Sequence, residues 1–249
     1  MNRQLPWHDQ DAFWELVEPF LFTMRRAELA YEQVDQIVAL LGLEAGARLL
    51  DLPCGNGRHA LELAAQGFDV TGVDRTRRYI ETARLEAERR GLAAAFQIGD
   101  MRAYRAPGQY DAVLNLFGSF GYFDDPADDL RVLRNMHDSL RPGGRLLIET
   151  AGKEIVAREF RPRDWFQEGD LLVLTERKVV QNWGRIETRY IVVRDGRRFE
   201  QTVSIRSFSA GELAALLAAG GFADVRVYGS LEGTSYDENA ERLVVVGRP

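Results

Sequence analysis

Two kinds of hydrophobic pattern alternate along the first 150 residues. Apolar residues at helical spacing predict two helices within residues 10–43, and glycines 42 and 46 mark their exit. Short apolar runs then predict strands at 48–52, 68–74, 94–98, 110–115 and 145–149, separated by helices at 58–65, 76–90 and 126–140. Thr76 is placed to cap the second of these helices. Strands that alternate with helices pair in parallel, so we expect a doubly wound α/β sheet.

The pattern changes after residue 160. Three strand-like runs, 171–180, 185–193 and 199–208, are linked by turns at Asn182-Trp183-Gly184 and Asp195-Gly196. An Asp-Gly pair between strands is a strong hairpin signal, so this segment is expected to be antiparallel.

The remaining residues return to the alternating pattern. Ser209 and Glu212 form a capping-box pattern at the start of a helix over 209–219. Strands follow at 225–228 and 242–246, and the second is apolar enough to lie inside a sheet. The fold class expected is therefore α/β, with a mostly parallel seven-stranded sheet and an antiparallel insertion. The domains expected are N-terminal helices or a lid (1–45), a main domain (46–155 and 209–249) and the insertion (160–208), which is expected either to cap a pocket or to form a dimer contact.

Charge and cysteine content narrow the function. The 249 residues hold 32 Lys and Arg against 38 Asp and Glu, a net charge of −6, which argues against a broad nucleic-acid surface. The single cysteine, Cys54, excludes an internal disulfide, and no His, Cys or carboxylate spacing indicates a metal site. No apolar run approaches membrane-spanning length and no apolar signal core opens the chain. We therefore expect a cytoplasmic protein with neither a nucleic-acid nor a membrane partner.

The residues that indicate chemistry follow the first three strands. Asp51 ends the first strand, and a Gly55-Asn56-Gly57 turn then opens a helix whose free N–H groups can face an anionic group. Asp74, at the end of the second strand, is placed to accept hydrogen bonds from ribose hydroxyls. The third strand ends in Gly99-Asp100-Met101, where the acid can bond an adenine amino group and Met101 can pack on the ring.

Two other nucleotide-binding patterns do not fit this turn. No Gly-Lys-Ser/Thr follows it, so it is not an NTPase phosphate loop. The three-glycine dinucleotide spacing is also missing, because Ala60 stands where the last glycine would be and Pro53 precedes the turn. A lone Gly-x-Gly is weak evidence, and the acids at three successive strand ends are what favour a ligand site.

With these motifs in order, the sequence resembles the class I S-adenosylmethionine-dependent methyltransferases, most closely the small-molecule type. The resemblance rests on residues 51–57, 73–74, 99–101, 117–123 and 140–144. It weakens over residues 160–208 and returns at 221–222 and 242–246.

The resemblance implies a cofactor, S-adenosyl-L-methionine, with S-adenosyl-L-homocysteine as the product. The cofactor-binding residues it implies are Asp51, Pro53, Cys54, Gly55, Asn56, Gly57, Asp74, Arg75, Gly99, Asp100, Met101, Leu116, Phe117 and Gly118. Pro53 departs from the glycine that many members carry, and it removes one backbone donor from the loop.

Candidates for catalysis and acceptor binding have two interpretations each. His59 and Tyr122 are candidate catalytic residues, but His59 can equally pack against the cofactor loop and Tyr122 can line the acceptor pocket or only pack. If the insertion caps the pocket, the candidate substrate contacts are Tyr122, Arg206 and Tyr236, together with Tyr228 and Glu232. Among the many arginines, only Arg58 and Arg206 are expected to have a functional role. The aromatic residues Trp7, Phe13, Trp14, Phe20 and Phe22 suit a lid helix or ordinary core packing.

The function expected is methyl transfer to nitrogen, oxygen or carbon of a small-molecule substrate, by a monomer or homodimer. Methyl transfer depends mainly on alignment, and an amine acceptor needs no strong base, whereas a hydroxyl or acidic carbon does. One alternative is a nucleic-acid or protein methyltransferase, although Asn115-Leu116-Phe117-Gly118 differs from the Asn-Pro-Pro-Tyr of amino-methylating nucleic-acid enzymes. The other alternative is a catalytically silent cofactor-binding regulatory protein.

Overall fold

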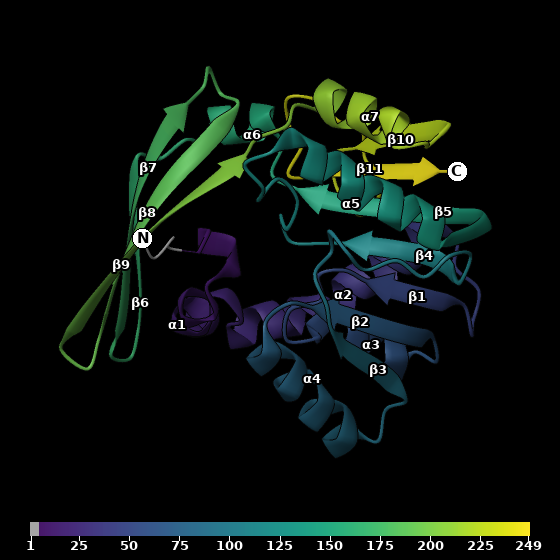
Figure 1. Cartoon of the computed structure of the whole chain (residues 1–249), viewed down its shortest axis with the longest axis horizontal. Coiled ribbons are helices and arrows are strands. Elements are labelled where there is room, and N and C mark those ends of the chain that lie inside the picture. Colours follow the sequence, from purple (N-terminus) through teal and green to yellow (C-terminus); the bar gives the residue numbers. More distant parts are fainter. Residues whose placement is uncertain (1–4) are drawn as a thin grey trace.

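The computed structural model describes residues 5–249 and contains two sheets with helices on both faces of the larger one (Figure 1). The helical elements are the 3₁₀ turn η1 (Trp7–Asp9) and the helices α1 (Asp11–Leu21), α2 (Met24–Leu41), α3 (Arg58–Ala65), α4 (Arg77–Arg90), α5 (Pro126–Ser139), α6 (Lys153–Arg158) and α7 (Ala210–Ala219). Across the described residues, no helix has the length and apolar character needed to cross a bilayer.

The larger sheet has seven strands in the order β10-β11-β5-β4-β1-β2-β3. These strands are β1 (Arg48–Asp51), β2 (Asp69–Asp74), β3 (Ala94–Ile98), β4 (Tyr110–Asn115), β5 (Leu140–Thr150), β10 (Asp224–Tyr228) and β11 (Leu243–Arg248). The first five pair in parallel, and β11 pairs antiparallel with both β5 and β10. The expected α/β class with a mostly parallel seven-stranded sheet is therefore confirmed, and the apolar β11 is an interior strand.

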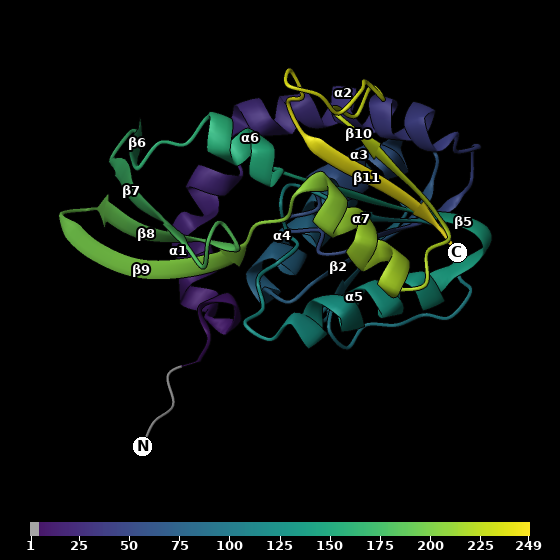
Figure 2. The ribbon, with the colours of Figure 1, turned by 90° about the horizontal axis from the view of Figure 1, so that it is seen from above.

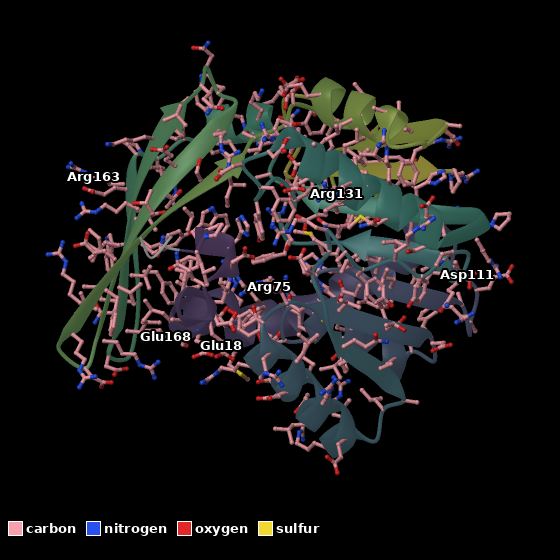
Figure 3. All side chains as sticks on the ribbon, in the orientation of Figure 1. Glu18, Arg75, Asp111, Arg131, Arg163 and Glu168 are labelled. Carbon is pink, nitrogen blue, oxygen red and sulfur yellow. The ribbon has the colours of Figure 1, made fainter. Side chains whose placement is uncertain are left out.

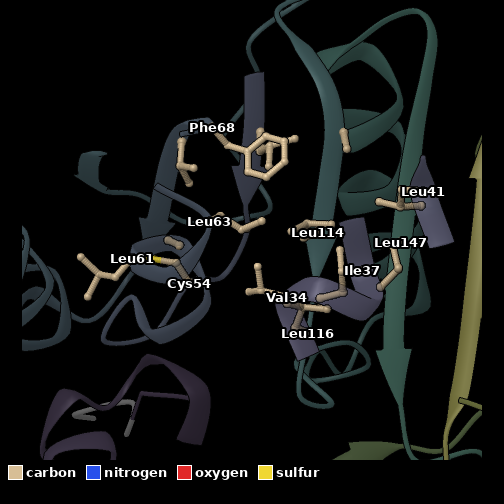
Figure 4. Close-up of a cluster of buried hydrophobic side chains, with 14 of the residues drawn as sticks. Val34, Ile37, Leu41, Cys54, Leu61, Leu63, Phe68, Leu114, Leu116 and Leu147 are labelled. Carbon is tan, nitrogen blue, oxygen red and sulfur yellow. The ribbon is translucent and has the colours of Figure 1, made fainter. Parts of the chain in front are cut away.

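Two hydrophobic layers hold this sheet between helices (Figure 2). On one face, apolar side chains of α2, α3 and α4 pack on the strands, with Val34, Ile37 and Leu41 of α2 fully buried (Figure 4). On the other face, α5 and α7 contribute buried leucines such as Leu133 and Leu217. Burial on both faces fixes the register of the parallel strands, and it aligns their carboxyl ends along one edge.

The second sheet is antiparallel, with the order β6-β7-β8-β9, and it is built from residues 163–206. Its strands are β6 (Arg163–Glu168), β7 (Leu171–Val180), β8 (Arg185–Arg194) and β9 (Arg197–Arg206). Helix α1 lies between this sheet and the larger one (Figure 1), and its buried Phe13 and Val17 pack on Val173, Val192 and Val203.

Local features test the sequence predictions in detail. The Ser209–Glu212 capping box is present, and Asp195 and Gly196 adopt the positive φ angles (50° and 70°) that a tight hairpin turn requires. Thr76 occupies the N-cap position of α4, but its side chain makes no capping hydrogen bond, and its backbone N–H donates to Asp74 Oδ1 at 2.7 Å.

Strand β6 and helix α6 were absent from the prediction. Five of the six residues of β6 are exposed, so this edge strand lacks the alternation of buried and exposed positions by which strands are recognised. Helix α6 has only six residues, too few to establish a helical period.

Gly57 controls how the first turn packs on the sheet. It has a φ of 83° at the N-cap of α3, and a Cβ atom there would lie 2.9 Å from both Ala83 Cβ and Phe96 Cε1. Gly67 has a similar φ of 90°, but a Cβ atom there would meet nothing within 4 Å. Replacing either glycine would therefore strain a left-handed backbone, but only a Cβ atom at position 57 would also clash with packed side chains.

We expect Gly57→Ala to destabilise the protein by about 1–3 kcal/mol more than Gly67→Ala, because only the first variant must displace packed side chains. The measurement is urea unfolding of both variants and the wild type. Equal losses of unfolding free energy in the two variants would contradict the packing role of Gly57.

Candidate functional site

A single pocket lies where the carboxyl ends of β1 to β4 face α1 and the antiparallel sheet. Its sheet-side wall is made of residues from the strand ends and the loops that follow them: Asp51, Pro53, Cys54, Gly55, Arg58, His59, Asp74, Arg75, Thr76, Gly99, Asp100, Met101, Leu116, Phe117 and Gly118. Carboxyl ends of parallel strands are the usual place for a ligand in this kind of fold. The structure thus brings most of the predicted cofactor residues together.

Asp51 is the most deeply buried acid of the pocket. Its side chain is 1% exposed, and its Oδ2 atom has no hydrogen-bond partner in the described part of the chain. Burial raises the pKa of Asp51 to about 8, against the lowering effect of the Arg58 charge. A buried carboxylate without a partner is costly, and such groups are concentrated at functional sites.

Asp74 is held in place by the backbone around it. Its Oδ2 accepts the Gly55 N–H at 2.9 Å and its Oδ1 accepts the Thr76 N–H at 2.7 Å. Burial raises the pKa of Asp74, while these two bonds oppose the rise. Each carboxylate oxygen can accept more than one hydrogen bond, so a fixed Asp74 can still bind hydroxyl donors.

Asp100 is paired with an arginine that sequence reasoning missed. Arg102 donates to both carboxylate oxygens of Asp100 and also reaches Asp9 of η1 at 3.2 Å. Although burial acts to raise the pKa of Asp100, the bonds from Arg102 lower it. Met101 beside it is buried and lines the pocket, as expected of an adenine-packing residue.

Arg75 adds a second link between the strand ends and the N-terminal segment. It lies 3.3 Å from Asp9 and 2.7 Å from Asp11, and it is close to the junction of α1 with the larger sheet (Figure 3). The ion pairs of Arg75 and Arg102 therefore fix the start of α1 over the ends of β2 and β3.

The loop after β1 is shaped by close packing. Gly55 has a φ of 56°, and a Cβ atom there would come within 2.9 Å of the Phe22 ring. Cys54 is buried, and burial raises the pKa of its thiol well above the usual range, so the thiol is not a nucleophile. His59 Nε2 lies 2.8 Å from Gln33 Oε1, and burial lowers the pKa of His59 to about 3.

Phe117 lies between two arginine side chains. The guanidinium of Arg58 is 4.5 Å from the ring centre and that of Arg26, from α2, is 4.7 Å away. Phe117 has a φ of 62°, and its N–H donates to Glu149 Oε2 at 2.6 Å.

Arg58 has a guanidinium N–H group that is available to a ligand. Its Nη1 donates to the Arg26 carbonyl at 2.9 Å, but its buried Nη2 has no partner among residues 5–249. Burial lowers the pKa of Arg58 to about 10, and the Arg26 charge adds to the lowering. Two partly buried positive charges close to each other favour an anionic group nearby. No local pattern could have indicated Arg26, because its contact with Phe117 is long-range.

The opposite wall comes from the N-terminal segment and the antiparallel sheet. Trp7, Phe13, Trp14 and Phe22 line the pocket, so four of the five proposed lid aromatics face it, and Phe13 also packs in the core. Tyr122 lines the same space, with ring centres 5.0 Å from Trp7 and 5.7 Å from Trp14.

Several predicted site residues lie outside the pocket wall. Asn56 and Gly57 belong to the turn behind it, and Tyr228 and Glu232 lie elsewhere. Arg206 bonds Asp129 Oδ2 at 2.8 Å and ties β9 to α5, because a buried carboxylate needs a counter-charge there.

Tyr236 is also directed away from the pocket. Its hydroxyl donates to Glu154 Oε2 at 2.9 Å. The structure therefore gives Arg206 and Tyr236 contacts within the protein and leaves Tyr122 as the predicted substrate residue that faces the pocket.

Comparison with known proteins indicates the kind of domain that contains this pocket. Residues 49–144 match a family described as a methyltransferase domain. The whole fold superposes on an S-adenosylmethionine-dependent methyltransferase from Clostridium acetobutylicum with a TM-score of 0.76 at 16% identity, covering 96% of this chain and 98% of that one. Residues 49–144 form a methyltransferase domain, and the whole fold is that of S-adenosylmethionine-dependent methyltransferases.

Further relatives of this methyltransferase domain differ in what their names say they methylate. The ubiquinone biosynthesis O-methyltransferase of Ruegeria pomeroyi is 36% identical over 110 residues, which are 44% of this chain and 43% of that protein. The match thus spans less than half the length of that relative. An amino pentose methyltransferase from Micromonospora echinaspora, solved with S-adenosylmethionine bound, is 25% identical, with a TM-score of 0.64 over 89% of this chain and 91% of that one.

The buried Asp51 should leave a signature in protein stability. Since its pKa is higher in the folded state (about 8) than in an unfolded chain (about 4), the folded state holds the proton more tightly. Its contribution to stability is therefore present below about pH 4, falls as pH rises, and is lost above about pH 8.

Asp51→Asn removes this titration and should be increasingly more stable than the wild type as pH rises from 5 to 9. We expect the difference in unfolding free energy to grow by on the order of 2 kcal/mol or more, measured by urea unfolding at both pH values. The exposed Asp69→Asn serves as the control. A difference that does not change with pH for Asp51→Asn would show that the carboxyl group is not desolvated.

Proposed function

We propose that the protein transfers the methyl group of S-adenosylmethionine to nitrogen, oxygen or carbon of a small-molecule acceptor. The observation that carries this proposal is the meeting of an unpartnered buried carboxylate oxygen, Asp51 Oδ2, and an unpartnered buried guanidinium nitrogen, Arg58 Nη2, in one pocket. An amino-acid group brings the ammonium and carboxylate that these two atoms lack.

The other pocket residues fit the rest of the cofactor. Asp74 is fixed at the position expected for a ribose acid, and Gly55 lines the pocket as bare backbone packed against the Phe22 ring. Met101 offers an apolar surface for the adenine, and Asp100 and Arg102 offer polar atoms at its edge. Bound there, S-adenosylmethionine supplies an activated methyl group on a sulfonium.

The chain contributes alignment and exclusion of water. Methyl transfer is an in-line displacement, in which the acceptor lone pair forms a bond to the methyl carbon as the carbon–sulfur bond breaks. S-adenosylhomocysteine is released, and any proton on the acceptor passes to solvent or to a nearby base. The cover of α1 and β8–β9 keeps competing water away from this region.

We assign different roles to the two candidate catalytic residues. Because Gln33 Oε1 can only accept, His59 Nε2 donates to it, and a histidine with a pKa near 3 is a weak base. We propose that His59 positions the cofactor loop and that Tyr122 borders the acceptor.

We also propose that residues 1–45 and 160–208 act as covers on a methyltransferase domain formed by 46–155 and 209–249. Residues 1–4 of the first segment lie outside the described structure. Support comes from the pocket itself, since Trp14 of α1, Tyr190 of β8 and Ile205 of β9 line it.

Two ligands separate the proposed subsites: S-adenosylhomocysteine and 5′-methylthioadenosine, which lacks the amino-acid group. Asp74→Ala should lower the affinity for both ligands by about 10-fold or more, because both ligands carry the ribose. Arg58→Gln should lower the affinity for S-adenosylhomocysteine by about 10-fold and should leave the affinity for 5′-methylthioadenosine within about twofold of the wild-type value. Isothermal titration calorimetry provides the measurement.

Arg25→Gln is the matched control, since Arg25 is an exposed neighbour of Arg26 on α2, and it should bind both ligands like the wild type. Absence of S-adenosylhomocysteine binding by the wild type would overturn the proposed function. If Arg58→Gln lost equal affinity for both ligands, the role of Arg58 at the amino-acid group would be wrong, but the proposed function would stand.

A further inference from the structure

The pocket wall that faces the strand-end acids is uncharged. It consists of side chains from α1, β8 and β9: Phe13, Trp14, Val17, Tyr190, Val203 and Ile205. Val17 and Val203 are 1% and 2% exposed, so this wall is closely packed against the rest of the protein.

Aromatic rings from distant parts of the chain meet along this wall. Trp7 and Trp14 lie 5.6 Å apart, and Tyr122, from the loop after β4, lies against both of them. Phe13 is in edge contact with Tyr190 of β8, with ring centres 5.8 Å apart. We call this group of five rings the aromatic chamber.

The charged groups nearest the aromatic chamber are already engaged. Arg102 is paired with Asp100 and Asp9, and Arg75 with Asp9 and Asp11. Near Tyr190, the guanidinium of Arg26 donates to the carbonyls of residues 20 and 21, and that of Arg177 donates to the Arg161 carbonyl. The Asp74 carboxylate, which acts on Tyr122, accepts the backbone N–H groups of Gly55 and Thr76. A charged or heavily hydroxylated ligand would therefore lose its water in the chamber without gaining ionic partners.

The polar atoms of the chamber can orient a ligand without ionising. Trp7 Nε1 is buried and has no acceptor within residues 5–249, and an indole nitrogen can only donate. Burial raises the pKa of both Tyr122 and Tyr190, so their hydroxyl groups keep their protons at neutral pH. Because Trp7 lines the pocket, its indole N–H is a donor that a lone pair of a ligand can satisfy.

We propose that the methyl acceptor is a neutral, planar aromatic or heteroaromatic molecule whose oxygen or nitrogen lone pair meets the Trp7 indole N–H. This inference rests on the proposed methyl transfer and names its substrate class. Edge-to-face and tilted contacts between rings add attraction beyond that of the buried area. In the reaction, a lone pair on the phenolic oxygen or ring nitrogen bonds the methyl carbon as the carbon–sulfur bond breaks. A phenolic acceptor gives its proton to water, whereas a pyridine-type nitrogen has no proton to release and takes up the positive charge.

The test compares probes that differ in charge or flatness, titrated into the protein with and without S-adenosylhomocysteine. We expect 3,4-dihydroxybenzaldehyde and 3-hydroxyquinoline to bind at least about 10-fold more tightly than 3,4-dihydroxybenzoate, which adds a carboxylate to the same ring. Glucosamine, an amino sugar, should bind more weakly than any of them. Calorimetry gives the affinities, and quenching of tryptophan fluorescence reports contact with the chamber.

Two variants locate the binding site of the probes. Trp7→Phe keeps an aromatic ring and removes the N–H, so it should lower the affinity for the aldehyde by about 3–10-fold. Trp165→Phe, on the exposed strand β6 with the tryptophan 67% exposed, should leave the affinity unchanged.

The outcomes separate the two proposals. Tighter binding of glucosamine or of the carboxylate, or loss of aldehyde binding in Trp165→Phe but not in Trp7→Phe, would overturn the aromatic acceptor. If the protein binds S-adenosylhomocysteine and yet prefers glucosamine, methyl transfer stands and only the substrate class is wrong. If S-adenosylhomocysteine does not bind, the proposed function itself is wrong.

Discussion

The structure depends on the alignment of parallel strand ends, which gathers buried charges at one edge of the sheet. Asp51 and Arg58 lie there with atoms that lack partners, and burying them costs folding free energy. The hydrophobic layers of α2 to α4 on one face and of α5 and α7 on the other offset that cost by fixing the strands between them. The protein thus maintains a polar site that would be unfavourable without a ligand to complete it.

The cover over this site is attached in two different ways. On the strand-end side, Arg75 and Arg102 link to the carboxylate of Asp9. On the far side, Phe13 and Val17 of α1 are buried against the antiparallel sheet. Partly exposed ion pairs are weakened by salt, whereas apolar packing is not. The first attachment is therefore the one that added salt weakens.

The fold and the cofactor side of the pocket could be predicted because their signals are local. Asp51 and Asp74 follow short apolar strands, and parallel pairing places such residues together whatever the distant contacts are. The pairing of Asp100 with Arg102 and Asp9 depends on where the N-terminal segment folds back, which no local pattern encodes. Arg206 was expected to contact substrate if the insertion capped the pocket, but its side chain pairs with the buried Asp129 of α5.

The most direct test of this account is amide hydrogen exchange with and without S-adenosylhomocysteine. Added ligand should slow exchange in the loops at residues 53–58, 74–76, 99–102 and 116–118, and in the N-terminal cover at 7–22. The polar hollow at the opposite edge of the sheet, beside Asp111 (Figure 3), should not change. Unchanged exchange in the four loops, or protection confined to the region of Asp111, would contradict the account.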